Sequence, residues 1–119
     1  MSPKIRSRSR SRTRARRPQP AILFAALGDA TRLALIGKLS SGQPASIAQL
    51  TAGSRLTRQA ISKHLRVLER AGLVRSVRAG RESRIALDPH AIEEMQKYLA
   101  AVSRRWDQAL ARLKAFVED

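Results

Sequence analysis

The segment from Ser46 to Leu87 constrains the fold most, because its pattern predicts two short helices joined by a tight turn and followed by an arginine-rich β-hairpin. Residues 55–84 within it carry nine Lys and Arg against two acidic residues, a net charge of +7 in a chain whose formal net charge is +15. This order of elements is typical of a winged helix-turn-helix, and the charge indicates a polyanionic partner. The sequence therefore predicts a domain that binds double-stranded DNA.

Length and charge distribution indicate one domain preceded by a basic arm. A chain of 119 residues is long enough for one domain with a sizeable core and too short for two. Residues 1–20 contain eight Lys and Arg and no acid, so we expect a disordered Arg/Ser-rich arm. Such an arm either follows DNA phosphates or adds only nonspecific affinity. Residues 21–119 then form a winged helix domain for DNA binding and dimerisation.

Several classes of function are disfavoured by what the sequence lacks. No apolar run approaches the roughly 20 residues that span a bilayer, and no stretch resembles a secretory signal, so we expect a cytoplasmic protein without a membrane partner. The absence of Cys removes disulfides and thiolate metal sites. There is no His-Glu-x-x-His motif or phosphate-binding glycine loop, and the two His have no evident acidic partner. We therefore expect no enzymatic activity and no cofactor.

Three short helices are predicted before residue 58. An apolar run at residues 22–27 ends at Gly28, and Asp29 is placed to cap the next helix. The inward-facing residues of that second helix are expected to be Leu33, Ile36 and Leu39. Ser46 is placed to cap the third helix, which carries Ile47 and Leu50 on its inner side.

The helix predicted over residues 58–71 is amphipathic. Thr57 precedes it as an N-cap, and Gly72 follows it as a C-terminal stop. Ile61, Leu65 and Leu68 recur at helical spacing and form a stripe that faces the core. The opposite face carries Arg58, Gln59, Ser62, Lys63 and Arg66. A basic first turn opposes the helix dipole, which bound phosphates or guanine edges would compensate.

A charged hairpin follows this helix. Residues 73–77 and 83–87 are predicted to be strands, with residues 78–82 as the turn. Gly80 lies between Arg78 and Arg81 at the tip, which suits a wing pressed against a DNA backbone or a narrow groove. The alternative is a short exposed hairpin that its charge keeps soluble.

The C-terminal helix is predicted to begin with Asp88 as N-cap and Pro89 in its first turn. Apolar residues then recur at spacings of three and four over about seven turns. They are Ile92, Met95, Leu99, Val102, Trp106, Leu110, Leu113 and Val117. A small domain cannot cover so long a stripe, so we expect a homodimer formed through this helix. The alternative is a stripe that packs entirely on its own domain.

Two runs resemble a known family. They are Leu-Gly-Asp-Ala-Thr-Arg-Leu at residues 27–33 and Thr-Arg-Gln-Ala-Ile-Ser-Lys-His-Leu-Arg-Val-Leu-Glu-Arg-Ala-Gly-Leu-Val at residues 57–74. With the Thr57 cap, they resemble the ArsR family of bacterial winged-helix repressors over residues 21–118. The resemblance implies a homodimer that occupies a palindromic operator and represses transcription, often of its own operon.

The residues expected to contact DNA combine this resemblance with the charge pattern. The resemblance places Arg58, Gln59, Ser62, Lys63 and His64 in the groove and Arg78 and Arg81 on the wing. The full set of predicted DNA contacts is Thr57, Arg58, Gln59, Ser62, Lys63, His64, Arg66, Arg70, Arg78 and Arg81. We interpret Arg66 and Arg70 as backbone anchors.

The sequence departs from the metal-sensing members of that family. Residues 46–52, where such members often carry Cys, hold none. Asp88 and His90 match half of a zinc site known between paired terminal helices, but Ala101 and Arg104 offer no ligands for the other half. Two ligands per subunit are too few for a closed zinc site. We therefore expect no bound metal and leave any effector open.

Two functions compete on this sequence. A sequence-specific repressor is favoured by Arg58 and Gln59, since Arg suits guanine and Gln suits adenine. An architectural or nucleoid-associated protein that binds DNA mainly through charge is favoured by the basic residues 1–20. The repressor is the primary hypothesis.

Overall fold

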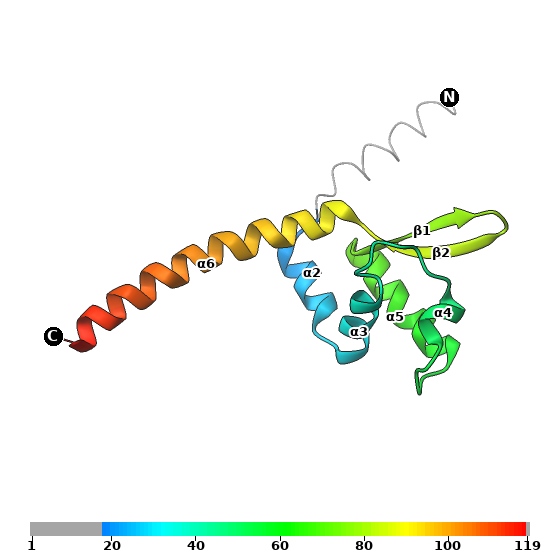
Figure 1. Ribbon diagram of the computed structural model, residues 1–119, viewed down its shortest axis with the longest axis horizontal. Helices are drawn as coiled ribbons and strands as arrows, with labels where there is room; N and C mark the ends of the chain where they lie inside the picture. The colour runs from blue at the N-terminus through cyan, green and yellow to red at the C-terminus, as the bar shows by residue number, and fades with distance from the viewer. Residues whose placement is uncertain (1–17, 119) are drawn as a thin grey trace, which may run out of the picture.

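The structure, a computed structural model, describes residues 18–118, which form five helices and a two-stranded antiparallel sheet (Figure 1). In chain order the elements are α2 (Pro20–Leu27), α3 (Ala30–Lys38), α4 (Ile47–Thr51), α5 (Arg58–Ala71), β1 (Val74–Ala79), β2 (Glu82–Leu87) and α6 (Pro89–Glu118). This arrangement confirms the predicted winged helix-turn-helix. Most of the predicted basic arm, residues 1–17, lies outside the described residues.

Polar side chains begin α3 and α4, as the sequence predicts. The carboxylate of Asp29 accepts a hydrogen bond from the backbone N–H of Arg32 at 3.0 Å. At α4, the Ser46 hydroxyl accepts from the Gln49 backbone N–H at 3.1 Å, and the Gln49 side chain accepts from the Ser46 N–H at 2.9 Å. These bonds satisfy backbone donors that the first turn of a helix leaves unpaired, which fixes where both helices start.

Thr57 and Gly72 set the two ends of α5. The Thr57 hydroxyl accepts a hydrogen bond from the backbone N–H three residues later, at 3.1 Å. Gly72 adopts the left-handed conformation with φ of 93°, which favours glycine because it has no Cβ. Between these ends Ile61, Leu65 and Leu68 are buried. The predicted ends and inward stripe of α5 are therefore confirmed.

The core lies where α2, α3, α4 and α5 meet the base of the wing and the start of α6. Its largest fully buried side chains are Leu23, Leu39, Leu50, Ile61, Leu68 and Leu73. On α3 one prediction is wrong, because Leu33 is 55% exposed while Leu35 is 2% exposed. Leu35 shares a face with the buried Leu39, whereas Leu33 lies about 200° around the helix from Leu35.

The wing is longer and its turn tighter than predicted. Strands β1 and β2 pair from Val74–Leu87 at the base to Ala79–Glu82 at the tip. The tip is therefore only Gly80 and Arg81, and the predicted turn over residues 78–82 is wrong at both edges. Gly80 has φ of 68°, so a two-residue turn continues the pairing. At the other side of β2, Ala45 and Ile85 exchange hydrogen bonds of 2.9 and 2.7 Å that attach the wing to the segment before α4.

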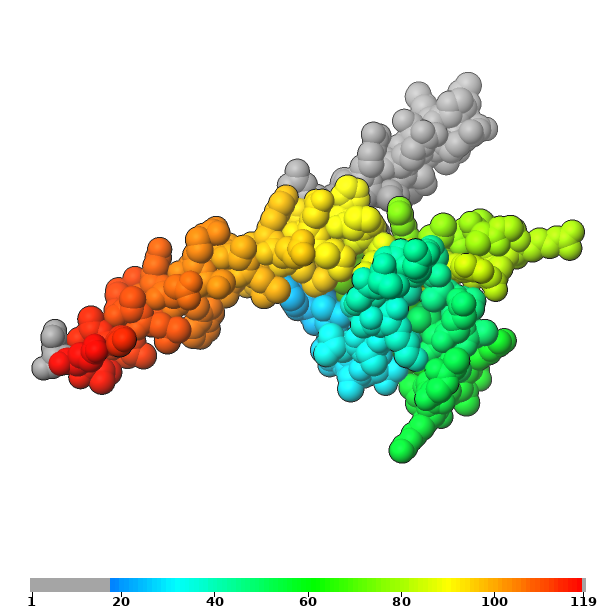
Figure 2. Space-filling model, viewed as in Figure 1, coloured from blue at the N-terminus to red at the C-terminus, as the bar shows by residue number. Residues whose placement is uncertain are grey.

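Helix α6 packs on the domain only through its first turns. Asp88 caps it by accepting from the backbone N–H of His90 at 2.9 Å, as predicted. Met95 is 8% exposed and lies in the protomer's own core, and Tyr98 contacts Phe24 of α2 with ring centroids 5.7 Å apart. Beyond this point α6 leaves the domain as a rod (Figures 1 and 2). Its 30 residues correspond to a length of about 45 Å.

In the described part of the chain, no single helix is long and apolar enough to cross a membrane. Only α2 and α3 taken together reach that length and composition, and they are bent by 101° relative to each other. Both helices contribute to the core, through Leu23 and Leu35. A role in packing accounts for their apolar composition.

Candidate nucleic-acid interface

Helix α5 exposes a polar face that is not used within the protomer. Arg58, Gln59, Lys63 and Arg66 are exposed, and Ser62 is half-buried. Between residues 18 and 118 these side chains form no hydrogen bond or ion pair. The donors of this face, which we call the α5 polar face, are therefore free to bind another molecule.

The position of this face depends on α4, and α4 depends on a lysine that the sequence analysis missed. Nζ of Lys38, at the end of α3, donates to the carbonyl oxygen of Leu50 at 3.0 Å and to that of Ala52 at 3.5 Å. These carbonyls belong to the C-terminal end of α4, where an ammonium group also complements the helix dipole. Helix α4 in turn packs against α5. No local pattern around Lys38 indicated this contact, because its partners lie 12 and 14 residues away.

The wing presents arginines without acidic partners on the same side of the domain as α4 and α5, away from the projecting end of α6 (Figure 1). Arg78 and Arg81 are exposed at and beside the tip. Glu82, the acid nearest in sequence, pairs with Nε of Arg84 at 2.9 Å. The tip arginines are therefore left to bind an external anion. Arg70, at the end of α5, and the Thr57 side chain at its start are also exposed.

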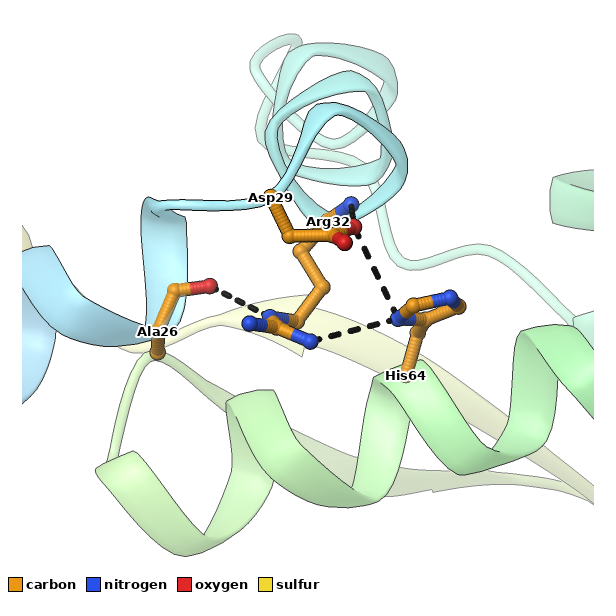
Figure 3. Close-up of polar contacts among 4 residues, drawn as sticks. All are labelled: Ala26, Asp29, Arg32 and His64. Carbon is orange, nitrogen blue, oxygen red and sulfur yellow. Dashed lines mark hydrogen bonds and ion pairs between the residues drawn. The ribbon is translucent and has the colours of Figure 1, made fainter.

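His64 differs from the rest of the predicted set. Its ring points back from α5 to the start of α3 (Figure 3). Nδ1 lies 3.7 Å from Oδ2 of Asp29 and 3.4 Å from Nη1 of Arg32. The expectation that His64 has no nearby acid is therefore wrong. Asp29 comes 35 residues earlier in the chain, so only the packing of α3 on α5 brings the two together.

The carboxyl of Asp29 is held in its charged form. The backbone N–H of Arg32 lowers the pKa of Asp29, and the positive charges of Arg32 and His64 lower it further, although burial acts in the opposite direction. A hydrogen bond to the ionised form stabilises that form relative to the acid. Asp29 therefore serves as helix cap and as anion beside His64.

Asp88 and His90, the two residues of the partial zinc motif, lie together at the start of α6. Residues 18–118 contain no group of three or more His, Asp and Glu side chains close enough to hold a metal ion. Asp88, one half of the partial zinc motif, uses its carboxylate to cap α6 at the backbone of His90. This contact accounts for the spacing of the two residues without a ligand.

Comparison with known proteins identifies the family. Residues 27–77 match a family described as "Helix-turn-helix domain". Over 65 residues, half of this chain and 71% of the relative, the chain is 45% identical to the uncharacterized HTH-type transcriptional regulator YuzN of Bacillus subtilis. Over 91 residues, 76% of this chain and 81% of the relative, it is 34% identical to the HTH-type transcriptional regulator Rv2034 of Mycobacterium tuberculosis.

Among solved structures, the fold matches an ArsR-like transcriptional regulator from Rhodococcus sp. RHA1 with a TM-score of 0.67 and 35% identity, covering 81% of this chain and 90% of that one. The chain belongs to the ArsR family of helix-turn-helix transcriptional regulators. The resemblance drawn from residues 27–33 and 57–74 is thereby confirmed. The family and fold are those of DNA-binding regulators rather than enzymes.

In this ArsR-family regulator the helix-turn-helix match runs from the end of α2 into β1. It therefore contains α4 and the whole of α5, which carries the α5 polar face. It excludes β2 and α6. The exposed apolar side chains of α6, from Leu99 to Val117, thus lie outside the helix-turn-helix match.

Proposed function

We propose that this chain is a homodimeric repressor that binds a palindromic operator, with α5 of each subunit in the major groove. The observation that carries the proposal is the α5 polar face, because its exposed Arg, Lys and Gln donors have no partner in the described part of the protomer. Major-groove base edges and phosphates offer acceptors for such groups.

Individual side chains on this surface suit different parts of DNA. Arg58 and Gln59, in the first turn of α5, have the bidentate geometry for guanine and adenine respectively. Lys63, Arg66 and Arg70 lie along the remaining exposed side and suit phosphates. The wing residues Arg78 and Arg81 suit the backbone or a narrow minor groove beside the reading site. The proposed site thus separates base readout from anchoring.

The homodimer is supported by the apolar surface of α6. The exposed fractions are 53% for Leu99, 61% for Trp106, 55% for Leu110, 57% for Leu113 and 72% for Val117, and Val102 is half-buried. So continuous a stripe is costly to leave in water, and the same helix of a second subunit would cover it. Met95 and part of Ile92 belong to the protomer's own core, so the proposed interface begins near Leu99.

Two-fold pairing also explains a palindromic operator. A dimer offers two copies of α5, which reach successive major grooves when they are about 34–36 Å apart. Occupancy of such a site blocks access to an overlapping promoter, which is repression by exclusion. The proposed action therefore needs only binding, and the regulator would act on an inverted repeat, including one upstream of its own gene.

The test is a titration of the full chain against a palindromic fragment from upstream of its gene and against scrambled DNA, at near-physiological salt. We expect the palindrome to bind about a thousandfold more tightly or better. A reporter behind the same fragment should lose expression when the protein is present. A reporter that gains expression would contradict repression, while leaving specific binding intact.

An architectural protein is the second candidate, favoured by the eight Lys and Arg of residues 1–20. In that case the affinity ratio of the two DNAs would be close to one. Deletion of residues 1–17, which hold all eight of these Lys and Arg and end before α2 and its cap Gln19, separates the contributions, because we expect it to weaken binding to both DNAs and to flatten the dependence on salt. If the deletion also abolished selectivity, the arm would be part of the reading surface.

A further inference from the structure

His64 connects α5 to the other side of the domain. Its Nδ1 is 3.4 Å from Nη1 of Arg32 and 3.7 Å from Oδ2 of Asp29, both on the first turn of α3 or its cap (Figure 3). Nε of Arg32 also donates to the carbonyl oxygen of Ala26 in α2, at 2.6 Å. A single ring nitrogen thus joins α5 to polar contacts that continue through α3 into α2.

The two neighbours of Nδ1 require opposite protonation of that atom. A guanidinium only donates hydrogen bonds, so the contact with Arg32 needs Nδ1 without a hydrogen and the proton of the neutral ring on Nε2. A carboxylate only accepts, so a hydrogen bond to Asp29 needs a hydrogen on Nδ1. The charged imidazolium carries hydrogens on both nitrogens and cannot accept from Arg32. When the ring gains a proton, its hydrogen-bond partner therefore changes from Arg32 to Asp29.

Few other ionisable groups reach this ring in the described part of the chain. Helices α2 and α4, which pack on α5, carry no ionisable side chain. Lys38 of α3 is bonded to the end of α4, and Arg75 and Arg78 of β1 are exposed. The other ionisable residues of α5 are Arg58, Lys63, Arg66, Glu69 and Arg70, all exposed. Because the pKa of Asp29 is lowered, its carboxylate stays charged between about pH 5 and 8, where histidines titrate.

We propose that His64 is a positioning residue whose protonation state sets the orientation of α5. The neutral ring accepts from Arg32 and holds the orientation seen here, and the protonated ring turns to Asp29. Arg32 has room to move, since it lines an open surface pocket of about 360 Å³ together with Ile22, Val67 and Arg70. This proposal rests on α5 being the DNA-reading helix.

We expect acidification to lower the selectivity for the operator over scrambled DNA, and not the affinity for DNA in general. Loss of the contact with Arg32 frees α5 from the orientation that suits the operator. The added positive charge, in contrast, increases attraction to any DNA. The ratio of operator affinity to scrambled-DNA affinity should therefore fall between about pH 8 and about pH 5.5, the range in which a histidine changes charge.

A first experiment follows the ring nitrogens of both histidines by NMR in the free full-length chain. At about pH 8 we expect Nδ1 of His64 to carry no hydrogen. At about pH 5.5 we expect a hydrogen on Nδ1, and Asp29→Asn should change the chemical shift of that hydrogen, because it removes the carboxylate 3.7 Å from Nδ1 while asparagine still caps α3. A hydrogen on Nδ1 at the higher pH, or an Nδ1 hydrogen signal that Asp29→Asn leaves unchanged at the lower pH, would overturn the partner exchange.

A second experiment measures the affinity ratio at both pH values. For the natural chain we expect a fall of about fivefold or more on acidification, within the usual range of coupling between sites. His64→Asn, whose amide oxygen can take the place of Nδ1, should keep a high ratio at both pH values. His64→Leu, which cannot accept from Arg32, should have a low ratio at both, with its fold checked by circular dichroism.

His90 provides the matched control, because it is the other histidine of the chain and is exposed at the start of α6. His90→Gln should keep the full dependence on pH. A ratio constant with pH in the natural chain, or a dependence lost in His90→Gln, contradicts the role of His64. Equal affinity for both DNAs at every pH instead contradicts the proposed function, and the NMR titration then decides the partner exchange by itself.

Discussion

Helices α5 and α6 are both amphipathic, yet α5 leaves its polar face without partners and α6 leaves its apolar face exposed. Helix α5 buries Ile61, Leu65 and Leu68 and exposes cations with no partner in the described residues. Helix α6 buries Ala91 and Met95 at its start and exposes apolar side chains over the rest of its length. A polar surface without partners favours a charged ligand, whereas an apolar surface favours removal from water by another protein surface.

The N-terminal ends of the two helices also differ. The first turn of α5 holds Arg58 and no acid, an arrangement that the helix dipole disfavours by about 0.3–1 kcal/mol. That cost is recovered when an anion binds there. Helix α6 has no comparable electrostatic conflict at its start, where Asp88 caps it. Each helix therefore exposes a surface that has no partner in the described residues, and we propose that DNA binds the polar face of α5 and that a second subunit covers the apolar stripe of α6.

The largest effect is expected from a charge placed in the apolar stripe of α6. Trp106→Glu should give monomers, because a carboxylate would have to be buried in the proposed interface. Operator affinity should fall about a thousandfold, toward nonspecific binding, since a monomer reaches only one half-site. Size-exclusion chromatography with light scattering and a DNA titration measure the two quantities.

The control for this prediction is Gln108→Glu, which places the same residue on the exposed opposite side of α6. It should remain dimeric and bind the operator. A Trp106→Glu protein that stayed dimeric would show that the stripe does not form the interface. The proposed difference between α5 and α6 would then be wrong.

An intermediate effect is expected from the α5 polar face. Arg58→Ala should weaken operator binding by about 1–3 kcal/mol and relax the choice of base at one position. Arg66→Ala, the matched control on the same face, should weaken all sequences alike because we assign it to phosphate. Binding to a set of operators with single base changes distinguishes the two. If both variants kept the same base preferences as the natural chain, base readout by Arg58 would be wrong.

A smaller effect is expected from the cap of α5. Thr57→Ala should lower the free energy of unfolding by about 1 kcal/mol, because the side chain no longer accepts a backbone N–H in the first turn. Gln108→Ala removes an exposed side chain from the side of α6 opposite the stripe and should cost nothing comparable. Urea unfolding compares the three proteins, and equal stabilities would show that the cap does not hold α5.

The smallest effect is expected from Asp29, and it depends on pH. Its folded-state pKa is lowered, so its charge stabilises the fold above the unfolded pKa of about 3.9, and this contribution disappears as the pH falls through the folded value. Asp29→Asn should therefore be less stable than the natural chain near pH 7 and equal to it in strong acid. Asp107→Asn, the same change on the exposed part of α6, controls for net charge. A difference that persists in strong acid would point to a lost contact instead of a lost charge.

Much of the fold could be predicted from the sequence because it is coded locally. Caps at Asp29, Ser46 and Thr57, the stop at Gly72 and the stripe of α5 depend on residues within four positions of one another. The wing tip was harder to predict from the sequence, because the register of β1 and β2 depends on cross-strand pairing. Leu33 is exposed although it follows the helical spacing of Ile36 and Leu39, because periodicity alone does not tell which side of a short helix meets the core.

The candidate site likewise has a part that could be predicted from the sequence and a part that could not. The exposed Arg, Gln and Lys of α5 follow from helical spacing once the buried stripe is known. The partners of His64 and the contact of Lys38 with α4 do not, because they join residues between 12 and 35 positions apart. No local signal marks which side chain will meet which backbone group after packing.

By itself, the sequence determined the order of helices and strands, the helix ends, the basic character of α5 and the apolar stripe of α6, since each depends on periodicity, capping or charge. The tertiary structure decided that Met95 belongs to the protomer's core, that the wing turns at Gly80 and Arg81, and that His64 faces Asp29 and Arg32. These outcomes depend on how elements pack against one another. Packing is a property of the whole domain, which no single stretch of sequence carries.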